Sequence, residues 1–217
     1  MVNWFKLFSR RKRQLPQRTD DEIKRIVNIL FIDDQRFKIV DTLKRSGWPN
    51  VDRIQDVETL DDPKIKNAHI LFVDIQGVGK KMQLKEEGLE LIIALKSRYP
   101  YKRIIAYSAE HQGKVEAFHR ALNFADSRLS KNASLYEFQT IIQRYSREIL
   151  SHEYFISRLQ EILRLEFNVS MERDELVSKL NIIQRGKDYS PARISDIFKV
   201  SSAADFATII QLFLTGA

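Results

Sequence analysis

The sequence predicts an α/β fold in which a parallel sheet lies between two layers of helices. Continuous runs of apolar and β-branched residues at 27–32, 68–74 and 103–107 indicate three buried strands. Strands that are buried on both faces have this pattern, and they occur in parallel sheets covered by helices. From residue 21 to about residue 130, strand patterns alternate with helix patterns, as the crossovers between parallel strands require.

Each of these strands ends in polar residues. The first is followed by Asp33 and Asp34, the second ends at Asp74, and the third is followed by Ser108. Ligands of open α/β sheets bind at the carboxyl ends of the strands, so these side chains converge on one pocket if the three strands are neighbours. Each acidic residue taken alone has another explanation, because Asp often follows a strand only as the N-cap of the next helix.

The composition favours one compact α/β domain with a smaller part attached. The chain has 217 residues, of which 43% are hydrophobic and 30% charged, and it has no cysteine. The lack of cysteine excludes disulfides, a thiolate nucleophile and a cysteine metal site, and it is compatible with a reducing cytoplasm. No apolar run approaches the ~20 residues that span a bilayer. We therefore expect a cytoplasmic protein.

Residues 1–22 form a basic, amphipathic N-terminal segment and linker. Apolar side chains at helical spacing, Trp4, Phe5, Leu7 and Phe8, stand directly before the basic cluster 10–13, and part of the net charge of +7 lies here. One interpretation is that residues 1–13 bind the inner face of the membrane, where rings enter the headgroup layer and cations meet anionic lipid. A disordered tail, or contact with nucleic acid or protein, stays open. We expect residues 16–21 to be a linker.

The remaining patterns complete a series of strands and helices. Helices are predicted after Asp34, at about 57–66, at 88–98 and near 113–123, with weaker strands at 53–54 and 126–129 and Lys131 after the last strand. This arrangement resembles the receiver domain of bacterial two-component response regulators over about residues 26–148. The five site positions of that family are matched by Asp33, Asp34, Asp74, Ser108 and Lys131. The resemblance implies a receiver domain at 23–148 with a five-stranded, doubly wound, flavodoxin-like sheet of order 2-1-3-4-5.

The resemblance also implies a role for each site residue. Asp74 would accept a phosphoryl group, Asp34 and Asp74 would bind a metal ion, and Asp33 would act on it largely through water. Gln76 would lend its backbone carbonyl to the metal, and Ser108 and Lys131 would hold phosphoryl oxygens. Several carboxylates in one pocket repel one another, and hard oxygen ligands without histidine favour Mg²⁺ as the neutralising cation.

The implied donor is a sensor histidine kinase or a phosphotransfer protein. No enzyme acting on a separate substrate is implied, only self-catalysed phosphoryl acceptance and hydrolysis. The sequence departs from the family pattern in three places. The loop between Asp74 and Gly88 is longer than usual, Asn132 replaces a proline, and Arg128 stands where an aromatic often reports phosphorylation. Tyr107 is a possible substitute for that aromatic, although an aromatic residue on a buried strand is more often part of the core.

Residues 149–217 are predicted to be a helical dimerisation or effector region. From a helix start near Ser134, apolar residues follow a heptad-like spacing typical of a coiled coil or a long helical hairpin: Leu135, Phe138, Ile142, Tyr145, Ile149, Ile156, Leu159 and Leu163. His152 is the polar member of this seam, and it would fix the register of a homodimer. As an alternative, Ser151-His152-Glu153 resembles the phosphoacceptor box of histidine kinases.

Further helices are predicted at 170–184 with Ser170 as N-cap, from Ser190-Pro191, and up to Leu214. Short helices also permit a helix-turn-helix. The last helix has no Lys or Arg between 203 and 214 to meet phosphates or base edges, so we do not expect nucleic acid as a partner. We expect a response regulator in which phosphorylation switches helical dimerisation or partner docking. The alternatives are a receiver-like scaffold that no longer signals and a DNA-binding transcriptional regulator.

Overall fold

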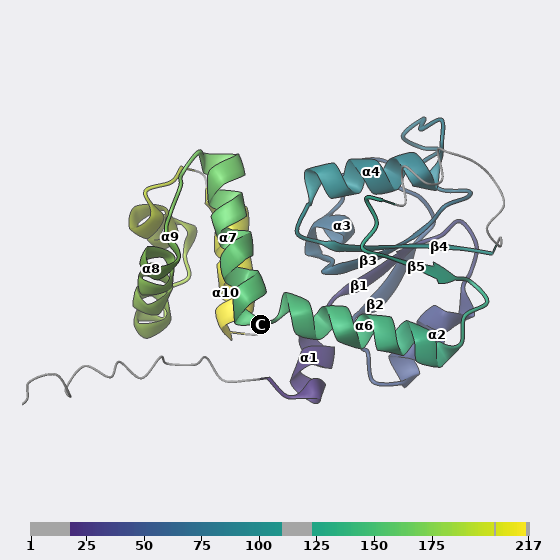
Figure 1. The fold of residues 1–217 in the computed structure, drawn as a ribbon, viewed down its shortest axis with the longest axis horizontal. Coiled ribbons are helices and arrows are strands. Elements are labelled where there is room, and N and C mark those ends of the chain that lie inside the picture. Colours follow the sequence, from purple (N-terminus) through teal and green to yellow (C-terminus); the bar gives the residue numbers. More distant parts are fainter. Residues whose placement is uncertain (1–17, 110–122, 202, 216–217) are drawn as a thin grey trace, which may run out of the picture.

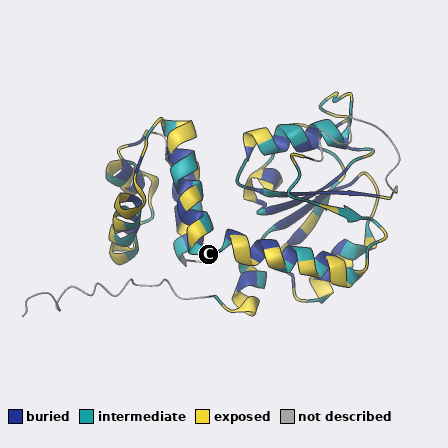
Figure 2. Cartoon of the chain, in the orientation of Figure 1, coloured by how far each residue is buried: buried dark blue, intermediate teal, exposed yellow. Residues whose placement is uncertain are grey.

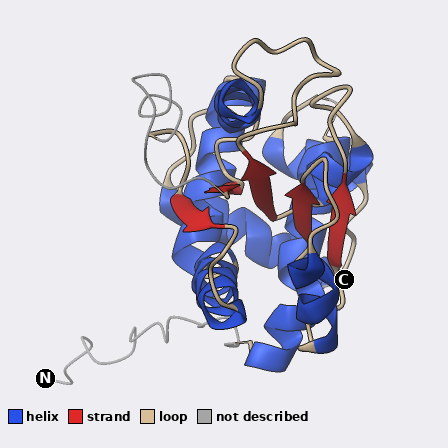
Figure 3. Cartoon of the chain, turned by 90° about the vertical axis from the view of Figure 1, so that its right-hand side faces the viewer, coloured by secondary structure: helices blue, strands red, loops and turns tan. Residues whose placement is uncertain are grey.

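A computed structural model describes residues 18–109, 123–201 and 203–215, and it contains one five-stranded sheet in which all neighbouring strands are parallel (Figure 1; Figure 3). The strands are β1 (Ile29–Ile32), β2 (Val51–Ile54), β3 (Ile70–Asp74), β4 (Arg103–Ser108) and β5 (Ser127–Ser130). Their order is β2-β1-β3-β4-β5, which confirms the predicted fold class and strand order. β1 and β3 are buried along their whole length, as the continuous apolar runs predict (Figure 2).

Two layers of helices cover the sheet (Figure 1). On one face lie α1 (Asp20–Ile26), α2 (Lys38–Arg45) and α6 (Leu135–Ile149), whose apolar side chains pack against Phe31, Phe72 and Tyr107. On the other face lie α3 (Pro63–Asn67) and α4 (Gly88–Arg98), which pack against Leu30, Leu71 and Ile104. The helix predicted near 113–123 falls outside the described residues, except for Asn123.

Helix α1 corrects the prediction that residues 16–21 are a linker. It begins at Asp20 because Thr19 and Glu22 form a reciprocal capping box, which satisfies backbone donors at the start of the helix. Asp20 also pairs with Arg147 of α6, with 2.9 Å between Nη2 and Oδ2. The start of the described chain is therefore held against the sheet. The membrane interpretation of residues 1–13 lies outside the described residues and stays a prediction.

The C-terminal region is a separate helical layer with its own core. It comprises α7 (His152–Phe167), α8 (Arg173–Gly186), α9 (Pro191–Phe198) and α10 (Ala204–Thr215). Helix α9 is capped by Ser190 as predicted, whereas α8 has Glu172 at its N-cap position and not Ser170. No helix among the described residues is both long enough and apolar enough to cross a membrane.

The apolar seam that we predicted as part of a coiled coil or a long helical hairpin is divided between two helices. α6 ends at Ile149, and the side chain of Ser151 accepts a hydrogen bond from the Tyr154 N–H at the start of α7. The N-terminal half of the seam, including Phe138 and Ile142, packs against the sheet, whereas the C-terminal half packs in the helical core. Both halves are thus used within one chain. His152 is no seam residue either: its ring lies 5.7 Å from that of Phe213, centroid to centroid.

Candidate functional site

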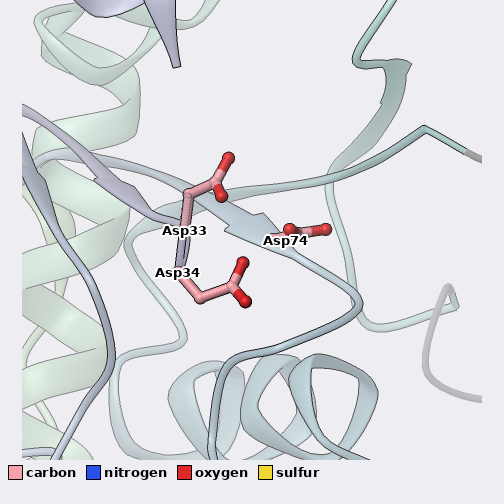
Figure 4. A group of neighbouring side chains, drawn as sticks. All are labelled: Asp33, Asp34 and Asp74. Atoms are coloured by element: carbon pink, nitrogen blue, oxygen red, sulfur yellow. The ribbon is translucent and has the colours of Figure 1, made fainter. Parts of the chain in front are cut away.

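The carboxylates of the three predicted acidic residues meet at the carboxyl edge of the sheet (Figure 4). Asp33 and Asp34 follow β1, and Asp74 ends β3, its neighbour in the sheet. One oxygen from each carboxylate lies within 4.8 Å of the other two. Asp33 and Asp74 are 1% and 3% exposed, whereas Asp34 is exposed. The site thus has a buried floor of two carboxylates and a third carboxylate open to solvent.

Lys131 joins the two buried carboxylates. Its Nζ lies 2.5 Å from Oδ2 of Asp74 and 3.1 Å from Oδ2 of Asp33. Burial lowers the pKa of the Lys131 ammonium, but the hydrogen bonds and negative charges of Asp74 and Asp33 outweigh it and raise the pKa overall. Burial also raises the pKa of Asp74, against the opposing hydrogen bond and charge of Lys131. The lysine is therefore held positively charged where it neutralises part of the acidic cluster.

Ser108 and Gln76 are placed at the same edge through their backbones. Ser108 ends β4, is 7% exposed, and accepts a hydrogen bond of 2.7 Å on its carbonyl oxygen from the Lys131 N–H. The preceding residue, Tyr107, is the register partner of Asp74. The N–H of Gln76 donates to Oδ1 of Asp74 at 3.3 Å, and the metal-binding role of its carbonyl stays a prediction. The structure therefore brings all six predicted site residues to one edge.

Tyr107, which the sequence indicated as a core aromatic or as a substitute for the aromatic that reports phosphorylation, contacts the acidic cluster directly. Its ring is 1% exposed and packs edge-on against Phe31 and Phe72, but its hydroxyl donates a hydrogen bond of 2.7 Å to Oδ2 of Asp33. Burial and the charge of Asp33 raise the pKa of the Tyr107 phenol far above its usual range. The hydroxyl is thus a fixed, neutral donor to the acidic cluster, and alternation along β4 does not reveal it.

Arg53 is a second residue whose role the sequence did not show. Its Nη1 donates to the carbonyl oxygen of Asp33 at 2.6 Å and to that of Gln35 at 3.2 Å. The Gln35 N–H in turn donates to Oδ1 of Asp33 at 2.9 Å. These contacts fix the loop after β1, and with it the direction of both Asp33 and Asp34. Because they join separate segments, only the folded arrangement shows them.

The long loop after Asp74 is anchored by carboxylates. Gly77 has a φ of +81°, and a Cβ at this position would lie 2.4 Å from Oδ2 of Asp34. The Gly77 N–H donates to Oε2 of Glu87 at 2.5 Å. Further along, the carboxylate of Asp56 accepts hydrogen bonds from the N–H groups of Gly79 and Lys81. The loop therefore passes directly beneath the Asp34 carboxylate, where only glycine fits.

The donor set fits a hard divalent cation. Three carboxylates supply oxygen ligands, and they exceed the single positive charge of Lys131 by two. Mg²⁺ binds through a few carboxylates and keeps several waters, so it suits a cluster that is open to solvent on the side of Asp34. Asp33, Asp34 and Asp74 are the residues that would hold it.

No protein-family model matches the chain, and no curated protein matches it. Solved structures do. A response regulator from Thermotoga maritima is 18% identical, with a TM-score of 0.44, over 55% of this chain and 97% of its own. A Burkholderia pseudomallei response regulator protein with a phosphorylated aspartic acid, calcium ion and citrate is 17% identical, with a TM-score of 0.41, over 80% and 93%. Salmonella enterica serovar Typhimurium RcsB, bound to promoter rprA in the presence of phosphomimetic BeF3⁻, is 17% identical, with a TM-score of 0.43, over 56% and 98%.

The solved structures to which this chain is similar are thus response regulators and receiver domains. The chain's own strand order is the one that the resemblance implies, three carboxylates meet at the edge of its sheet, and a helical region follows. The expectation that nucleic acid is not a partner stays a prediction. The domain boundaries at residues 22 and 148 and the homodimer also stay predictions.

Proposed function

We propose that this protein is a response regulator that accepts a phosphoryl group on Asp74, with Mg²⁺, from a sensor histidine kinase or a phosphotransfer protein. The observation that carries the proposal is the position of the Asp74 carboxylate at the sheet edge. It lies 2.5 Å from the ammonium of Lys131 and within 4.8 Å of the carboxylate oxygens of Asp33 and Asp34. An acceptor, a fixed cation and a metal-binding pair are thus gathered in one place.

Each residue has a definite part in the proposed chemistry. Asp74 is the nucleophile, and burial by the surrounding strands keeps bulk water away from its carboxylate. Lys131 and the Ser108 hydroxyl hold oxygens of the incoming phosphoryl group, and Tyr107 and Arg53 keep Asp33 in place. A bound Mg²⁺ supplies positive charge that stabilises the negative charge on the transferring group.

In the transfer step, one oxygen of Asp74 forms a bond to phosphorus while the phosphorus–nitrogen bond of a phosphohistidine donor breaks. The bonding electrons leave with the imidazole nitrogen, which takes up a proton. Hydrolysis later returns the free carboxylate and inorganic phosphate. Apart from the phosphoryl donor, this chemistry requires no substrate, because the group that is hydrolysed is the one bound to Asp74. A cytoplasmic location suits donors of this class.

The connection to the helical region runs through α6. Phe138 of α6 contacts Phe31 of β1 and Phe72 of β3, with ring centroids 6.3 Å and 5.7 Å apart, and these strands carry Asp33 and Asp74 at their ends. α6 then leads directly into α7. A change at the acidic cluster would therefore reach the helical region through α6 and shift how it pairs or docks.

The proposal is tested by treating the full-length protein with acetyl phosphate and Mg²⁺ and measuring its mass. We expect the wild type to gain the mass of one phosphoryl group and Asp74→Asn to gain none. The matched control is Asp41→Asn, an exposed aspartate on α2 of the same domain, which should react as the wild type does. Light scattering of the same three proteins with and without beryllofluoride then measures whether this phosphoryl mimic changes their assembly state. A folded wild type that takes up no phosphoryl group would favour a receiver-like scaffold instead.

A further inference from the structure

A cavity of about 190 Å³ lies at the end of the sheet opposite to Asp74, between the sheet and the helical region. It is lined by residues that precede β3 and β4, by the α6–α7 connection, and by α7 and α10. A cavity of ~150 Å³ in a protein core is large enough to admit benzene. The volume therefore suits a small organic molecule with one ring and a substituent.

Two cations, the buried Lys102 and the half-buried Arg158, line this cavity from opposite sides. Lys102, just before β4, is 4% exposed, and its ammonium donates to the carbonyl oxygens of Lys66 and Ala68 at 2.7 Å and 2.5 Å. An ammonium has three donors, so one remains for a ligand. Arg158 of α7 lies over the ring of Tyr101 and forms a side-chain hydrogen bond with it, and it makes no ion pair with any residue of the described ranges. Neither cation is neutralised by a paired carboxylate.

The acidic residues that line the cavity are at exposed positions. Glu166 and Asp205 are among the lining residues, but both are exposed, and Glu166 acts electrostatically on the exposed Arg98. Glu161, one helical turn from Arg158, lies near enough to act on it electrostatically. Burial, and then the charge of Arg158, lower the pKa of Lys102. Within the described ranges, Lys102 and Arg158 thus face the cavity without an ion pair to either lining carboxylate.

Aromatic rings form much of the remaining wall. Tyr99 and Tyr101 pack edge-on on the side of the sheet, and Phe155 and Phe213 stack on the side of the helices. Ligand sites commonly combine apolar, aromatic walls with a small number of polar groups that fix the ligand's orientation. Here those groups are cations, which select for a negative charge.

We propose that this cavity binds a small aromatic anion, with its carboxylate or phosphate-type group on Arg158 and Lys102 and its ring among the aromatic side chains. The two cations come from different parts of the chain, one from the sheet and one from the helical region. Such a ligand would therefore bridge the two parts. Any change in their packing that alters the cavity would alter ligand affinity, and ligand binding would favour one packing in return.

The test is calorimetric titration of the full-length protein with benzoate and with phenylphosphonate. Benzamide, which has the same ring but no charge, is the matched neutral compound. We expect saturable binding of both anions and at least about tenfold weaker binding of benzamide, the ratio expected from one lost charge-assisted hydrogen bond. The affinity of Arg158→Gln for both anions should be lower than that of the wild type by a similar factor. Arg164 is an exposed residue on the same helix, so Arg164→Gln should bind the anions as the wild type does.

The comparison of benzoate with benzamide on the wild type keeps the result decisive even if Arg158→Gln folds poorly. Benzoate should also bind Asp74→Asn with unchanged affinity, since the cavity is at the opposite end of the sheet from Asp74. Absence of saturable anion binding to folded wild type, equal binding of benzamide, or loss of binding in Asp74→Asn would each overturn the proposal.

Discussion

The hydroxyl of Tyr107 donates a hydrogen bond to Oδ2 of Asp33 at a distance of 2.7 Å, and this bond joins the aromatic core to the acidic cluster. The same carboxylate oxygen lies 3.1 Å from Nζ of Lys131. Asp33 is thus held by a neutral donor from the core and by a cation from the sheet edge. A residue that packs like any core aromatic therefore also sets the geometry of the candidate site.

Replacing Tyr107 with phenylalanine should keep the ring packing and remove only this hydrogen bond. We expect the free energy of unfolding in Mg²⁺-free buffer to fall by about 1.5 kcal/mol, the lower range for a hydrogen bond to a charged group, because Lys131 still contacts Asp33. Urea unfolding at pH 7 measures this change. Tyr136→Phe is the control: this tyrosine is 75% exposed, so its loss should leave stability unchanged. Equal stability of the two variants would show that the Tyr107 hydroxyl contributes nothing.

Replacing Gly77 with alanine should weaken metal binding. The new Cβ would lie 2.4 Å from Oδ2 of Asp34, so either the loop or the Asp34 carboxylate must move. The φ of +81° adds a cost of about 1 kcal/mol for a residue with a Cβ. We expect lower Mg²⁺ affinity by calorimetry and lower stability in urea.

Gly186→Ala provides the matched control for this change. No atom lies within 4 Å of a Cβ built at Gly186, which is the last residue of α8. Alanine favours helix over glycine, so this variant should be as stable as the wild type or slightly more stable, with unchanged Mg²⁺ affinity. If Gly77→Ala bound Mg²⁺ as tightly as Gly186→Ala does, the loop and not the Asp34 carboxylate would have moved, and the expected coupling between Gly77 and the metal site would be wrong.

The strand-end acids could be predicted because their signal is local. Each buried strand is a short apolar run, and the polar residue that ends it is visible in the sequence at Asp33, Asp74 and Ser108. The strand order came from the family resemblance, since apolar runs do not say which strands are neighbours. Once that order is given, the meeting of these residues at one edge follows from parallel geometry. The contacts of Tyr107 and Arg53 with Asp33 could not be predicted because they cross between segments.

The break between α6 and α7 shows where periodicity misleads. The apolar spacing continues through residues 149–152 without Gly or Pro, so it indicates one helix. In the structure the two halves pack against different cores, and Ser151 caps the second helix. A spacing pattern shows which side chains are buried but not against what they pack. For α1, in contrast, the sequence carries a local signal: Thr19 and Glu22 have the spacing of a capping box, although Pro16 a few residues earlier favours a linker.

His69 should make the stability of the protein depend on pH. Its Nδ1 accepts a hydrogen bond of 3.0 Å from the Asn28 N–H, and it lies beside the cationic cavity. Burial, followed by the positive charges of Lys102, Arg158 and Arg18, lowers the pKa of His69 to about 3. The imidazole is therefore neutral in the folded protein at pH values where it is protonated in the unfolded chain.

The direction in which stability changes with pH follows from the difference in bound protons between the folded and the unfolded protein. The unfolded chain takes up a proton below its ordinary histidine pKa of ~6.5, whereas the folded protein does so only near pH 3. The contribution of His69 is fully present above pH ~6.5 and is lost as the pH falls through this window, by at most about 1.4 kcal/mol per pH unit. We expect urea unfolding between pH 7 and pH 5 to show a smaller loss of stability in His69→Gln than in the wild type. Glutamine stays neutral across this range, so the variant retains only the slope that the carboxylates and the other histidines cause. Parallel slopes for the two proteins would mean that His69 is protonated equally in the folded and unfolded states, and the buried positive charge around the cavity would then not act on it.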